Sequence, residues 1–350
     1  MTAVSCRTVP ISQITADLRD RWVLTQEHEA EFSSPFFRPE FALCIGRHFS
    51  GIEAAVLEDG PSRGFLSFVR SRSGFASSLP MCDYDGVVAD RVLRWDADRL
   101  LRDLKLAAWD FSNLLASQLE GRPARVVSGH ESPFADLSAG LAGFRSRVES
   151  RSPDRLRDIE YQERQLAKRF GEVRFTADEP DGAALLALLD WKAKKFGPRG
   201  GMPARIIASL QDMRAHRTAG FRGHLSALYA GDRLVAAHFG LSSGTVFHYW
   251  FPAYDESFAT HSPGSILMWK LIQHAAASGF RRFDMGSGGE PYKLKWMNGV
   301  IAVAQGSFES GRPAVRLRSA LRFAGHTARN CPPVVAAVRA LKAVVRRAKP

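Results

Sequence analysis

Residues 262–265 begin a helix and are of types that can bind an anion. They read Ser-Pro-Gly-Ser. Ser262 is a favourable N-cap, and Pro263 suits the first helical position because its missing N–H would be unpaired there anyway. Free backbone N–H groups and the positive end of the helix dipole make such a start a seat for phosphate or pyrophosphate. The alternative is an ordinary helix start that binds nothing.

The elements on either side of this helix are the ones that must position a site. An aromatic strand is expected at 247–251, and a polar loop leads from it to the helix, which Gly279 ends. A second short strand is expected at 282–285, followed by a glycine-rich turn and a short basic and aromatic helix that contains Pro-Tyr-Lys. We expect the rest of the chain to be organised around this stretch.

The remaining pattern predicts helices and strands in two groups. In the second group, helices at 181–196 and 203–219 precede three strands joined by tight turns, at 223–230, 234–241 and 245–251. In the first group we expect a helix at 14–29, a hairpin of strands 52–57 and 64–69, a helix at 97–108 and a strand at 111–115. A loop at 79–88 carries two acids and a tyrosine.

The segment between the two groups is harder to interpret. Residues 121–143 are expected to be irregular, and we place the linker between Leu141 and Ser152. A highly charged helix follows, capped by Ser152, begun by Pro153 and running to Phe170. It either presents a solvated face or forms a groove wall facing an anionic substrate.

The composition is that of a soluble globular protein long enough for two domains or one duplicated fold. The 350 residues are 45% hydrophobic and 24% charged. No apolar run approaches the roughly 20 residues that span a bilayer, and no signal peptide is recognised, so we expect a cytoplasmic protein. The four cysteines and ten histidines lack the spacing of a disulfide framework or a metal site, so neither is predicted.

Most of the net charge of +12 lies at the C-terminus. Residues 311–350 contain eight arginines, two lysines and no acid, which leaves +2 for the first 310 residues. The overall charge is therefore no signature of nucleic-acid binding. Two short basic amphipathic helices are expected in this tail, around Pro332 and Pro333. They suit peripheral contact with an anionic inner membrane face or an acidic partner, and packing on the body with a solvated basic face is an equal alternative.

The order of these motifs resembles the C-terminal half of GNAT-type acetyltransferases of cellulose and polysaccharide biosynthesis. Those proteins are related to the Fem-type aminoacyl transferases, which carry two GNAT-like halves. The resemblance is carried by Tyr254-Asp255, Phe258-Ala259, Ser262-Pro263-Gly264, Asp284, Gly286, Gly288 and Tyr292-Lys293, and by Ser34-Pro35-Phe36-Phe37, Phe41 and Trp109-Asp110-Phe111 nearer the N-terminus. Where the family has an acid after Gly288, this chain has Gly289 and then Glu290, which leaves the role of that acid open.

The resemblance implies an α+β fold of two tandem GNAT-like (acyl-CoA N-acyltransferase) halves, with mixed sheets flanked by helices. We place a degenerate GNAT-like half at 1–145, the GNAT acyltransferase half at 150–310 and a basic helical tail at 311–350. No internal repeat is visible in the sequence.

The resemblance also implies roles for individual residues. In a GNAT fold the acyl-CoA donor lies between two splayed strands, which correspond here to 247–251 and 282–285. The implied donor-binding residues are Tyr249, Phe251, His261, Ser262, Pro263, Gly264, Ser265 and Lys293. The implied catalytic residues are His248, Asp255 and Asp284, as candidates for the general base, and Tyr292, as the acid that protonates the leaving thiolate.

Each of these residues has a structural alternative. His248 could be a hydrogen-bonded histidine of the sheet, Asp255 could cap its loop, and Asp284 could form an Asx-turn. His261 could be a bystander in its loop. Lys293 could pair with a donor phosphate or with Glu290, and we favour the phosphate.

The sequence thus predicts an enzyme that transfers an acetyl or other acyl group from acyl-CoA to a hydroxyl or amine. The resemblance suggests a small or saccharide acceptor in polysaccharide or envelope biosynthesis. One alternative is a Fem-like transferase that uses aminoacyl-tRNA, but the body is nearly neutral, whereas tRNA binding needs a spread basic surface. Another is a non-catalytic scaffold that retains the fold and recruits partners through its tail.

Overall fold

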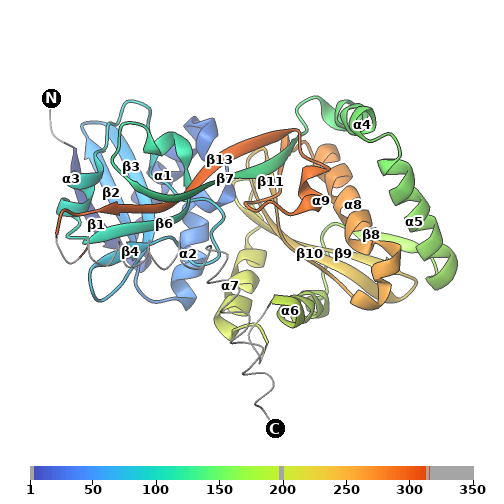
Figure 1. Ribbon diagram of the computed structural model, residues 1–350. Coiled ribbons are helices and arrows are strands. Elements are labelled where there is room, and N and C mark those ends of the chain that lie inside the picture. Colours follow the sequence, from blue (N-terminus) through green and yellow to red (C-terminus); the bar gives the residue numbers. More distant parts are fainter. Residues whose placement is uncertain (1–3, 197–200, 313–314, 316–350) are drawn as a thin grey trace, which may run out of the picture.

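Hairpins at both ends of the molecule extend into a single mixed sheet. The computed structural model describes residues 4–196, 201–312 and 315. The thirteen strands in these residues form one sheet in the order β1-β2-β3-β4-β6-β13-β7-β12-β11-β10-β9-β8, with β5 paired to β3. Figure 1 shows two halves side by side, with β7 and β13 running from one to the other.

The N-terminal half is an antiparallel meander followed by a parallel crossover. The predicted hairpin is present, with β2 and β3 paired from Ile52 opposite Val69 to Asp59 opposite Ser62. After the crossover, β4 pairs in parallel with β6. The strands of this half are β1 (Ser5–Pro10), β2 (Ile52–Asp59), β3 (Ser62–Arg70), β4 (Phe75–Ser77), β5 (Val88–Ala89) and β6 (Ala108–Leu115), and its helices are α1 (Ala16–His28), α2 (Pro39–His48) and α3 (Ala97–Asp103).

Helix α3 is shorter than its apolar spacing predicts. It ends at Asp103 because Lys105 takes a left-handed conformation (φ 55°), and the Leu106 N–H donates to the Leu101 carbonyl in a C-terminal capping turn. No glycine marks this end, so the sequence pattern continued the helix to residue 108. The chain instead enters β6 at Ala108.

The C-terminal half repeats the same plan with longer elements. Strands β8 to β11 form an antiparallel meander, and β11 pairs in parallel with β12 after a crossover through α8. The predicted three-stranded meander and the Ser-Pro-Gly helix are both present. The strands are β8 (Val173–Thr176), β9 (Arg222–Ala230), β10 (Arg233–Ser243), β11 (Val246–Tyr254) and β12 (Arg282–Asp284), and the helices are α5 (Arg155–Phe170), α6 (Gly182–Phe196), α7 (Ala204–Ala215), α8 (Pro263–Ala277) and α9 (Pro291–Leu294).

Two strands join the halves, and neither was predicted from the sequence. Residues Arg125–Asp136, expected to be irregular, form β7, whose partners are β12 on one side and β13 (Gly299–Glu309) on the other. Strand β13 also pairs with β6 of the N-terminal half. Pro133 and the polar residues of this segment argue against a strand in the sequence. Its strand partners are distant in the sequence, so they give no local signal either. The segment expected to be a linker contains α4 (Gly140–Arg151).

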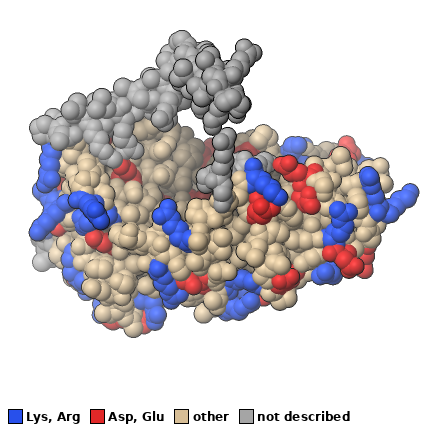
Figure 2. Space-filling view, turned by 90° about the horizontal axis from the view of Figure 1, so that it is seen from below, with Lys and Arg blue, Asp and Glu red and all other residues tan. Residues whose placement is uncertain are grey.

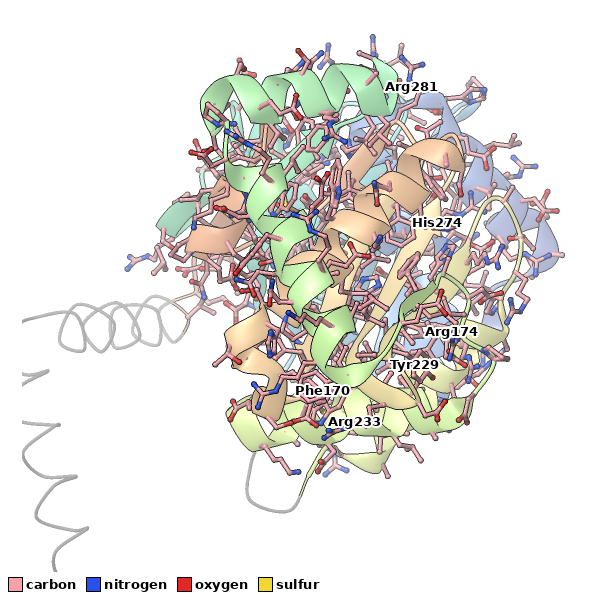
Figure 3. All side chains as sticks on the ribbon, turned by 90° about the vertical axis from the view of Figure 1, so that its right-hand side faces the viewer. Phe170, Arg174, Tyr229, Arg233, His274 and Arg281 are labelled. Carbon is pink, nitrogen blue, oxygen red and sulfur yellow. The ribbon has the colours of Figure 1, made fainter. Side chains whose placement is uncertain are left out.

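Helix α5 covers the outer side of the C-terminal half. It begins at Arg155 rather than at Pro153, buries Leu156, Ile159 and Leu166, and leaves its charged face to solvent. Beside it, arginines stack on aromatic rings: the Arg174 guanidinium lies 4.3 Å from the ring centre of Tyr229, and Arg233 lies 5.5 Å from Phe170 (Figure 3). The second contact joins the end of α5 to the start of β10, and the first joins β8 to β9.

The surface of the described residues carries mixed charge. Lysine, arginine and acidic side chains are interspersed on the face shown in Figure 2. In the described part of the chain, no helix has the length and apolar character needed to cross a membrane. Of the predicted basic tail, residues 313–314 and 316–350 lie outside the described residues, and Val315 is buried against Ala107 and Ala108.

Candidate active site

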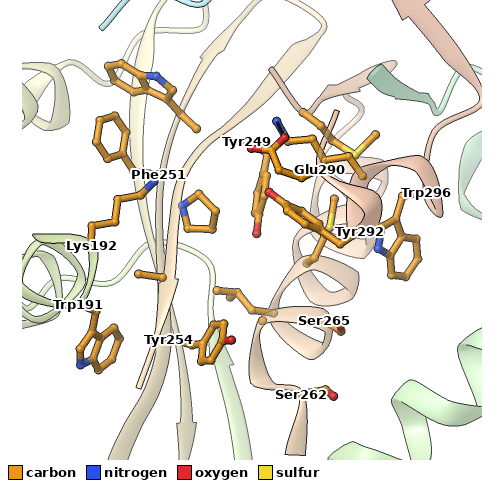
Figure 4. A pocket seen from close by; sticks show the side chains of 18 of the residues that line it. Trp191, Lys192, Tyr249, Phe251, Tyr254, Ser262, Ser265, Glu290, Tyr292 and Trp296 are labelled. Carbon is orange, nitrogen blue, oxygen red and sulfur yellow. Dashed lines mark ion pairs between the residues drawn. The ribbon is translucent and has the colours of Figure 1, made fainter. Parts of the chain in front are cut away.

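A cleft of about 1000 Å³ opens in the C-terminal half, within the size range of ligand sites. Strand β11 forms its floor, and the start of α8, the end of α6, the turn after β12 and helix α9 form its walls (Figure 4). No residue of α5 lines it, so the predicted groove wall at 152–170 does not face this cleft. The lining includes Asp83, Trp191, Lys192, Tyr249, Phe251, Tyr254, Asp255, Ser262, Gly264, Ser265, Met285, Glu290, Tyr292, Lys293 and Trp296.

The cleft exists because β11 and β12 diverge. Their parallel pairing runs from Val246 opposite Arg282 to His248 opposite Asp284 and ends there. Beyond this point the Met285 N–H donates to the Pro133 carbonyl of β7, while β11 continues along β10 to Tyr254. The six residues of β11 after His248 extend for about 20 Å at the usual rise of a strand. The backbone edge of residues 249–253 that faces away from β10 is thus available to a bound molecule.

At the far end of β11, the start of α8 is open toward the cleft. Ser262 is left-handed (φ 51°), and its carbonyl, not its side chain, accepts from the N–H groups of Ser265 (2.9 Å) and Ile266 (3.2 Å). Ser262 therefore occupies the predicted N-cap position, but its side chain makes no capping hydrogen bond. The first turn holds no acid, and Ser262, Gly264 and Ser265 all line the cleft. We call residues 262–265 the donor seat.

Two predicted donor-binding residues stand apart from this surface. Pro263, at the start of α8, is the residue of the donor seat that is buried and does not line the cleft. The His261 ring packs edge-on against Phe170, with 5.6 Å between ring centres, and is not among the cleft-lining residues. Its Nε2 is buried without a hydrogen-bond partner among the described residues.

Two tyrosines face each other at the other end of the cleft (Figure 4). Tyr249 is buried, and burial raises the pKa of its hydroxyl well above the ordinary value, with a further contribution from Tyr292. Burial, and next to it the Glu290 carboxylate, also raises the pKa of Tyr292. Both hydroxyls therefore keep their protons at neutral pH, as groups that donate to a leaving thiolate must.

Lys293 holds the turn that separates β12 from α9. Its side chain is buried, and the ammonium donates to the carbonyls of Gly286 (3.3 Å) and Ser287 (3.1 Å). The ammonium also forms an ion pair with Glu290 at 2.9 Å. Of the two partners that the sequence left open, this structure shows Glu290; the phosphate contact remains a prediction.

His248 lies beneath the reactive end of the cleft and is fully buried. Its Nε2 is 2.9 Å from Oδ2 of Asp83, and its Nδ1 is 3.4 Å from Oδ1 of Asp284, within ion-pair distance but not aligned as a hydrogen bond. Asp284 is also fully buried and accepts from the Tyr84 hydroxyl (2.9 Å) and the Gly286 N–H (3.0 Å). We call Asp83, His248, Asp284 and Tyr84 the histidine network.

The N-terminal half thus contributes to the site, which the sequence did not predict. Among the described residues that line the cleft, Asp83 is the one from that half. The two acids and the tyrosine of the loop at 79–88 were the available signal, but a loop signal alone does not reveal a partner 165 residues away.

The remaining predicted residues lie along the cleft floor. Asp255 lines the cleft, and its Oδ1 accepts from the Ser257 N–H (2.9 Å), so it caps the following turn of 3₁₀ helix, as its structural alternative proposed. Phe251 also lines the cleft and lies 4.9 Å from the ammonium of Lys192. His248 and Asp284 come together, whereas Asp255 lies toward the donor seat.

Comparison with known proteins supports this geometry. Residues 153–294 match the family model described as an acetyltransferase (GNAT) domain. No sequence among the curated proteins matches this chain.

Several solved structures share the fold over most of both chains. The C-terminal domain (DUF2156) of a candidate lysylphosphatidylglycerol synthetase from Agrobacterium fabrum is 13% identical with a TM-score of 0.54, covering 87% of this chain and 96% of that one. FemX is 9% identical with a TM-score of 0.54, covering 89% and 99%. A protein of unknown function from Bacteroides thetaiotaomicron is 13% identical with a TM-score of 0.52, covering 85% and 98%.

The predicted α+β fold of tandem GNAT-like halves, with a mixed sheet flanked by helices, is confirmed. The splayed strands and the open helix start lie within or beside the matched segment. Residues 153–294 are thus similar to an acetyltransferase (GNAT) domain, and the protein is an acyltransferase.

Proposed function

We propose that this protein transfers an acetyl or other acyl group from acyl-CoA to a hydroxyl or amine of a small or saccharide acceptor. The pyrophosphate of the donor binds at the donor seat. The pantetheine arm follows the free edge of β11, and the thioester lies beside Tyr249 and Met285. One observation supports this proposal most strongly: within one cleft, the unpaired edge of β11 leads to a helix N-terminus that has no acidic residue in its first turn.

The chemistry required of the protein is modest. A thioester is already activated, so positioning and proton transfer supply most of the acceleration. Tyr292 lines the cleft and keeps its proton at neutral pH, which suits donation to the departing sulfur. Lys192 and Lys194 of α6 line the opposite wall and add positive charge beside an anionic donor.

Titration calorimetry with acetyl-CoA tests this proposal. A side chain added at Gly264 would meet the Tyr254 ring at 3.2 Å, so Gly264→Glu puts both bulk and negative charge at the donor seat. We expect micromolar binding by the unaltered protein and its loss in this variant. Ala277→Glu, at the exposed far end of the same helix, is the control: it adds the same side chain outside the cleft, so it should bind acetyl-CoA normally. No binding of any acyl-CoA by the unaltered protein would overturn the proposal.

The resemblance to polysaccharide-biosynthesis transferases favours a saccharide acceptor in envelope biosynthesis. It also favours a cytoplasmic protein whose tail at 311–350, with ten basic residues and no acid, contacts an anionic membrane face. Removing the residues after Pro332 should then abolish sedimentation with anionic vesicles. If the full chain never sediments with such vesicles, the membrane contact is wrong.

Aminoacyl transfer from tRNA is the second candidate, because FemX shares the fold. Against it, the first 310 residues carry a net charge of only +2, and the charges on the face in Figure 2 are mixed. A non-catalytic scaffold is the third. Against it, a buried histidine lies between two carboxylates beside an open cleft, an arrangement that a non-catalytic scaffold does not need.

A further inference from the structure

We propose that Asp83, supplied by the N-terminal half, is the general base of this site. This inference rests on the proposed acyl transfer and adds a catalytic residue to it. It departs from the sequence prediction, which placed the base among residues of the C-terminal half.

Asp83 is the member of the histidine network that can reach an acceptor. Its side chain is 26% exposed and lines the cleft, whereas those of His248 and Asp284 are fully buried. The thioester is proposed to lie beside Met285, and the Asp83 carboxylate is close to the next residue, Gly286. Asp83 therefore lies at the same end of the cleft. A side chain added at Gly286 would come within 2.4 Å of Asp83 Oδ2, and the φ of +71° there also favours glycine.

His248 acts through Asp83 and is a positioning residue. Its ring lies edge-on to Phe36, with 4.8 Å between ring centres, and its two nitrogens face Asp83 and Asp284. Asp284 is in turn fixed by the Tyr84 hydroxyl and the Gly286 N–H. A carboxylate held by a buried histidine keeps one orientation toward the cleft, which a general base requires.

The other charged, titratable and polar groups near this network come from four segments. Asp85 and Cys82 neighbour Asp83 and Tyr84 in the same loop, and Arg282 of β12 lies 3.7 Å from Asp284. The Ser132 hydroxyl of β7 is hydrogen-bonded to the Tyr84 hydroxyl, and Glu290, paired with Lys293, lies beyond Gly286. Apart from Glu290 and Lys293, Asp83 is the charged side chain that these segments present to the cleft.

A carboxylate base favours an amine over a hydroxyl. An alkylammonium has a pKa of about 10.4, as in lysine, whereas the pKa of a water-like hydroxyl is far higher. Proton transfer to a carboxylate is therefore far less unfavourable from the ammonium. The negative charge of Asp83 also attracts an ammonium and repels an anionic acceptor.

These residues account for every proton that moves in the reaction. The bound ammonium loses one proton to Asp83 and becomes a nucleophilic amine. Its nitrogen bonds to the acyl carbon and the carbon–sulfur bond breaks. The second nitrogen proton passes to the departing sulfur through Tyr292. The products are an amide and free CoA, and Asp83 returns its proton to solvent.

CoA release from acetyl-CoA, measured with paired acceptors, tests this preference for an amine. The pairs are glucosamine with glucose and ethylamine with ethanol. We expect the amine of at least one pair to accelerate CoA release and its hydroxyl partner not to. Equal acceleration by hydroxyl partners overturns the preference for an amine. Acetyl-CoA binding with no acceleration by either amine also overturns it and leaves the donor site standing. Failure to bind acetyl-CoA overturns the proposed function itself.

Variants test the base with the active amine. Asp83→Asn keeps the size of the side chain, and we expect kcat at neutral pH to fall roughly 10²–10⁴-fold with the acetyl-CoA Kd unchanged. This loss should shrink as the pH approaches the pKa of the amine, because solvent then supplies the neutral nucleophile. His248→Gln should lower kcat by about tenfold, without this recovery at high pH.

Asp98→Asn is the matched control, an exposed acid in the first turn of α3 in the same half, and it should keep full activity. A purely structural role for Asp83 would lower kcat equally at every pH. That result, or full activity of Asp83→Asn at neutral pH, overturns the assignment of the base.

Discussion

The two halves follow one strand plan but only one presents a donor seat. In each, a meander ends in a strand that pairs in parallel with the strand after a crossover: β4 with β6, and β11 with β12. Strand β4 has three residues and β11 has nine; α3 has seven and α8 has fifteen. Strand β4 ends with the parallel pair, and beyond it the edge of β6 is covered by the loop at 79–88, whose Asp85 N–H donates to the Asn113 carbonyl (2.9 Å).

The N-termini of α3 and α8 also differ in whether they can accept an anion. In α3 the Asp96 side chain accepts from the Arg99 N–H (2.8 Å), and Asp98 adds a second acid to the first turn. These carboxylates occupy the positive helix end that an anionic ligand would need. In α8 the first turn has no acid and the Ser262 side chain makes no cap. Capping chemistry therefore distinguishes a closed helix start from one open to a phosphate.

The N-terminal half fills the corresponding region with aromatic side chains. The Trp109 ring lies 5.6 Å from that of Phe308, and both pack in the cluster that includes Leu100 and Leu101 of α3. A cavity found in this half measures about 10 Å³, barely the space of one water molecule. What this half contributes to the site is the loop of its crossover, which delivers Asp83 and Tyr84 to the other half.

The largest predicted effect tests whether the two halves are one folding unit. Gly306 of β13 lies at a register shift between β6 and β7, and an added side chain would come within 2.3 Å of the Arg125 carbonyl. Gly306→Ala must therefore shift the backbone of the joining strands, and we expect a loss of roughly 3–4 kcal/mol in the free energy of unfolding. Urea unfolding followed by tryptophan fluorescence measures it.

Gly129→Ala on the neighbouring strand is the matched control. Its added side chain would lie 3.9 Å from the Val303 carbonyl, in ordinary contact, so we expect a change within about 0.5 kcal/mol. In Gly306→Ala both halves should unfold in one transition, because β13 belongs to the ladder of each. Two separated transitions, with the C-terminal half unaffected, would contradict a single unit.

The second prediction contrasts one buried titratable group from each half. Burial raises the pKa of Asp85 to about 6, so stability from this group is present below its unfolded pKa and is lost as the pH rises from about 4 to 6. Burial, and next to it Arg222, lowers the pKa of His224 to about 3. Stability from His224 is thus present above its unfolded pKa of about 6.5 and is lost as the pH falls toward 3.

Each effect should amount to a few kcal/mol over its pH range, since one pKa unit corresponds to about 1.4 kcal/mol. The measurement is the free energy of unfolding against pH for Asp85→Asn and His224→Gln. The first variant should flatten the profile between pH 4 and 6, and the second should flatten it between pH 3 and 6.5. Profiles unchanged in shape would show that these two groups do not control the acid stability.

Local signals explain which parts of the fold the sequence predicted. Tight Gly-Asp and Ser-Gly turns placed the meander of β9 to β11, and proline in the first turn placed α8. The parts that were missed depend on distant partners. Strand β7 contains Pro133 and few apolar residues, and it is a strand because β12 and β13 flank it. The end of α3 depends on a left-handed lysine, which no sequence rule marks.

The candidate site divides in the same way. Tyr249, Ser262, Gly264 and Tyr292 lie on consecutive elements and were found from their order along the chain. Asp83 was missed because only the folded sheet brings its loop to His248. Ser262 was correctly placed at the N-cap, but its hydroxyl makes no capping hydrogen bond, and its backbone is left-handed (φ 51°) where an N-cap residue is usually extended.

The smallest predicted effect isolates what the N-terminal half adds to the site. Tyr84→Phe removes one hydroxyl that donates to Asp284 and leaves the aromatic ring in place. A buried carboxylate that loses a donor costs about 1–3 kcal/mol of stability, and we expect kcat to fall by about tenfold as the histidine network loosens. The Kd of acetyl-CoA should not change, because Tyr84 lies outside the cleft lining.

Tyr292→Phe provides the comparison from the C-terminal half. Its hydroxyl faces the cleft, so its loss should lower kcat without the stability cost that accompanies the loss of the buried Tyr84 hydroxyl. Steady-state kinetics and thermal unfolding of the two variants separate these effects. If Tyr84→Phe lost stability but kept full kcat, the N-terminal half would support the site only through packing, and the contribution of Asp83 would have to be independent of Asp284.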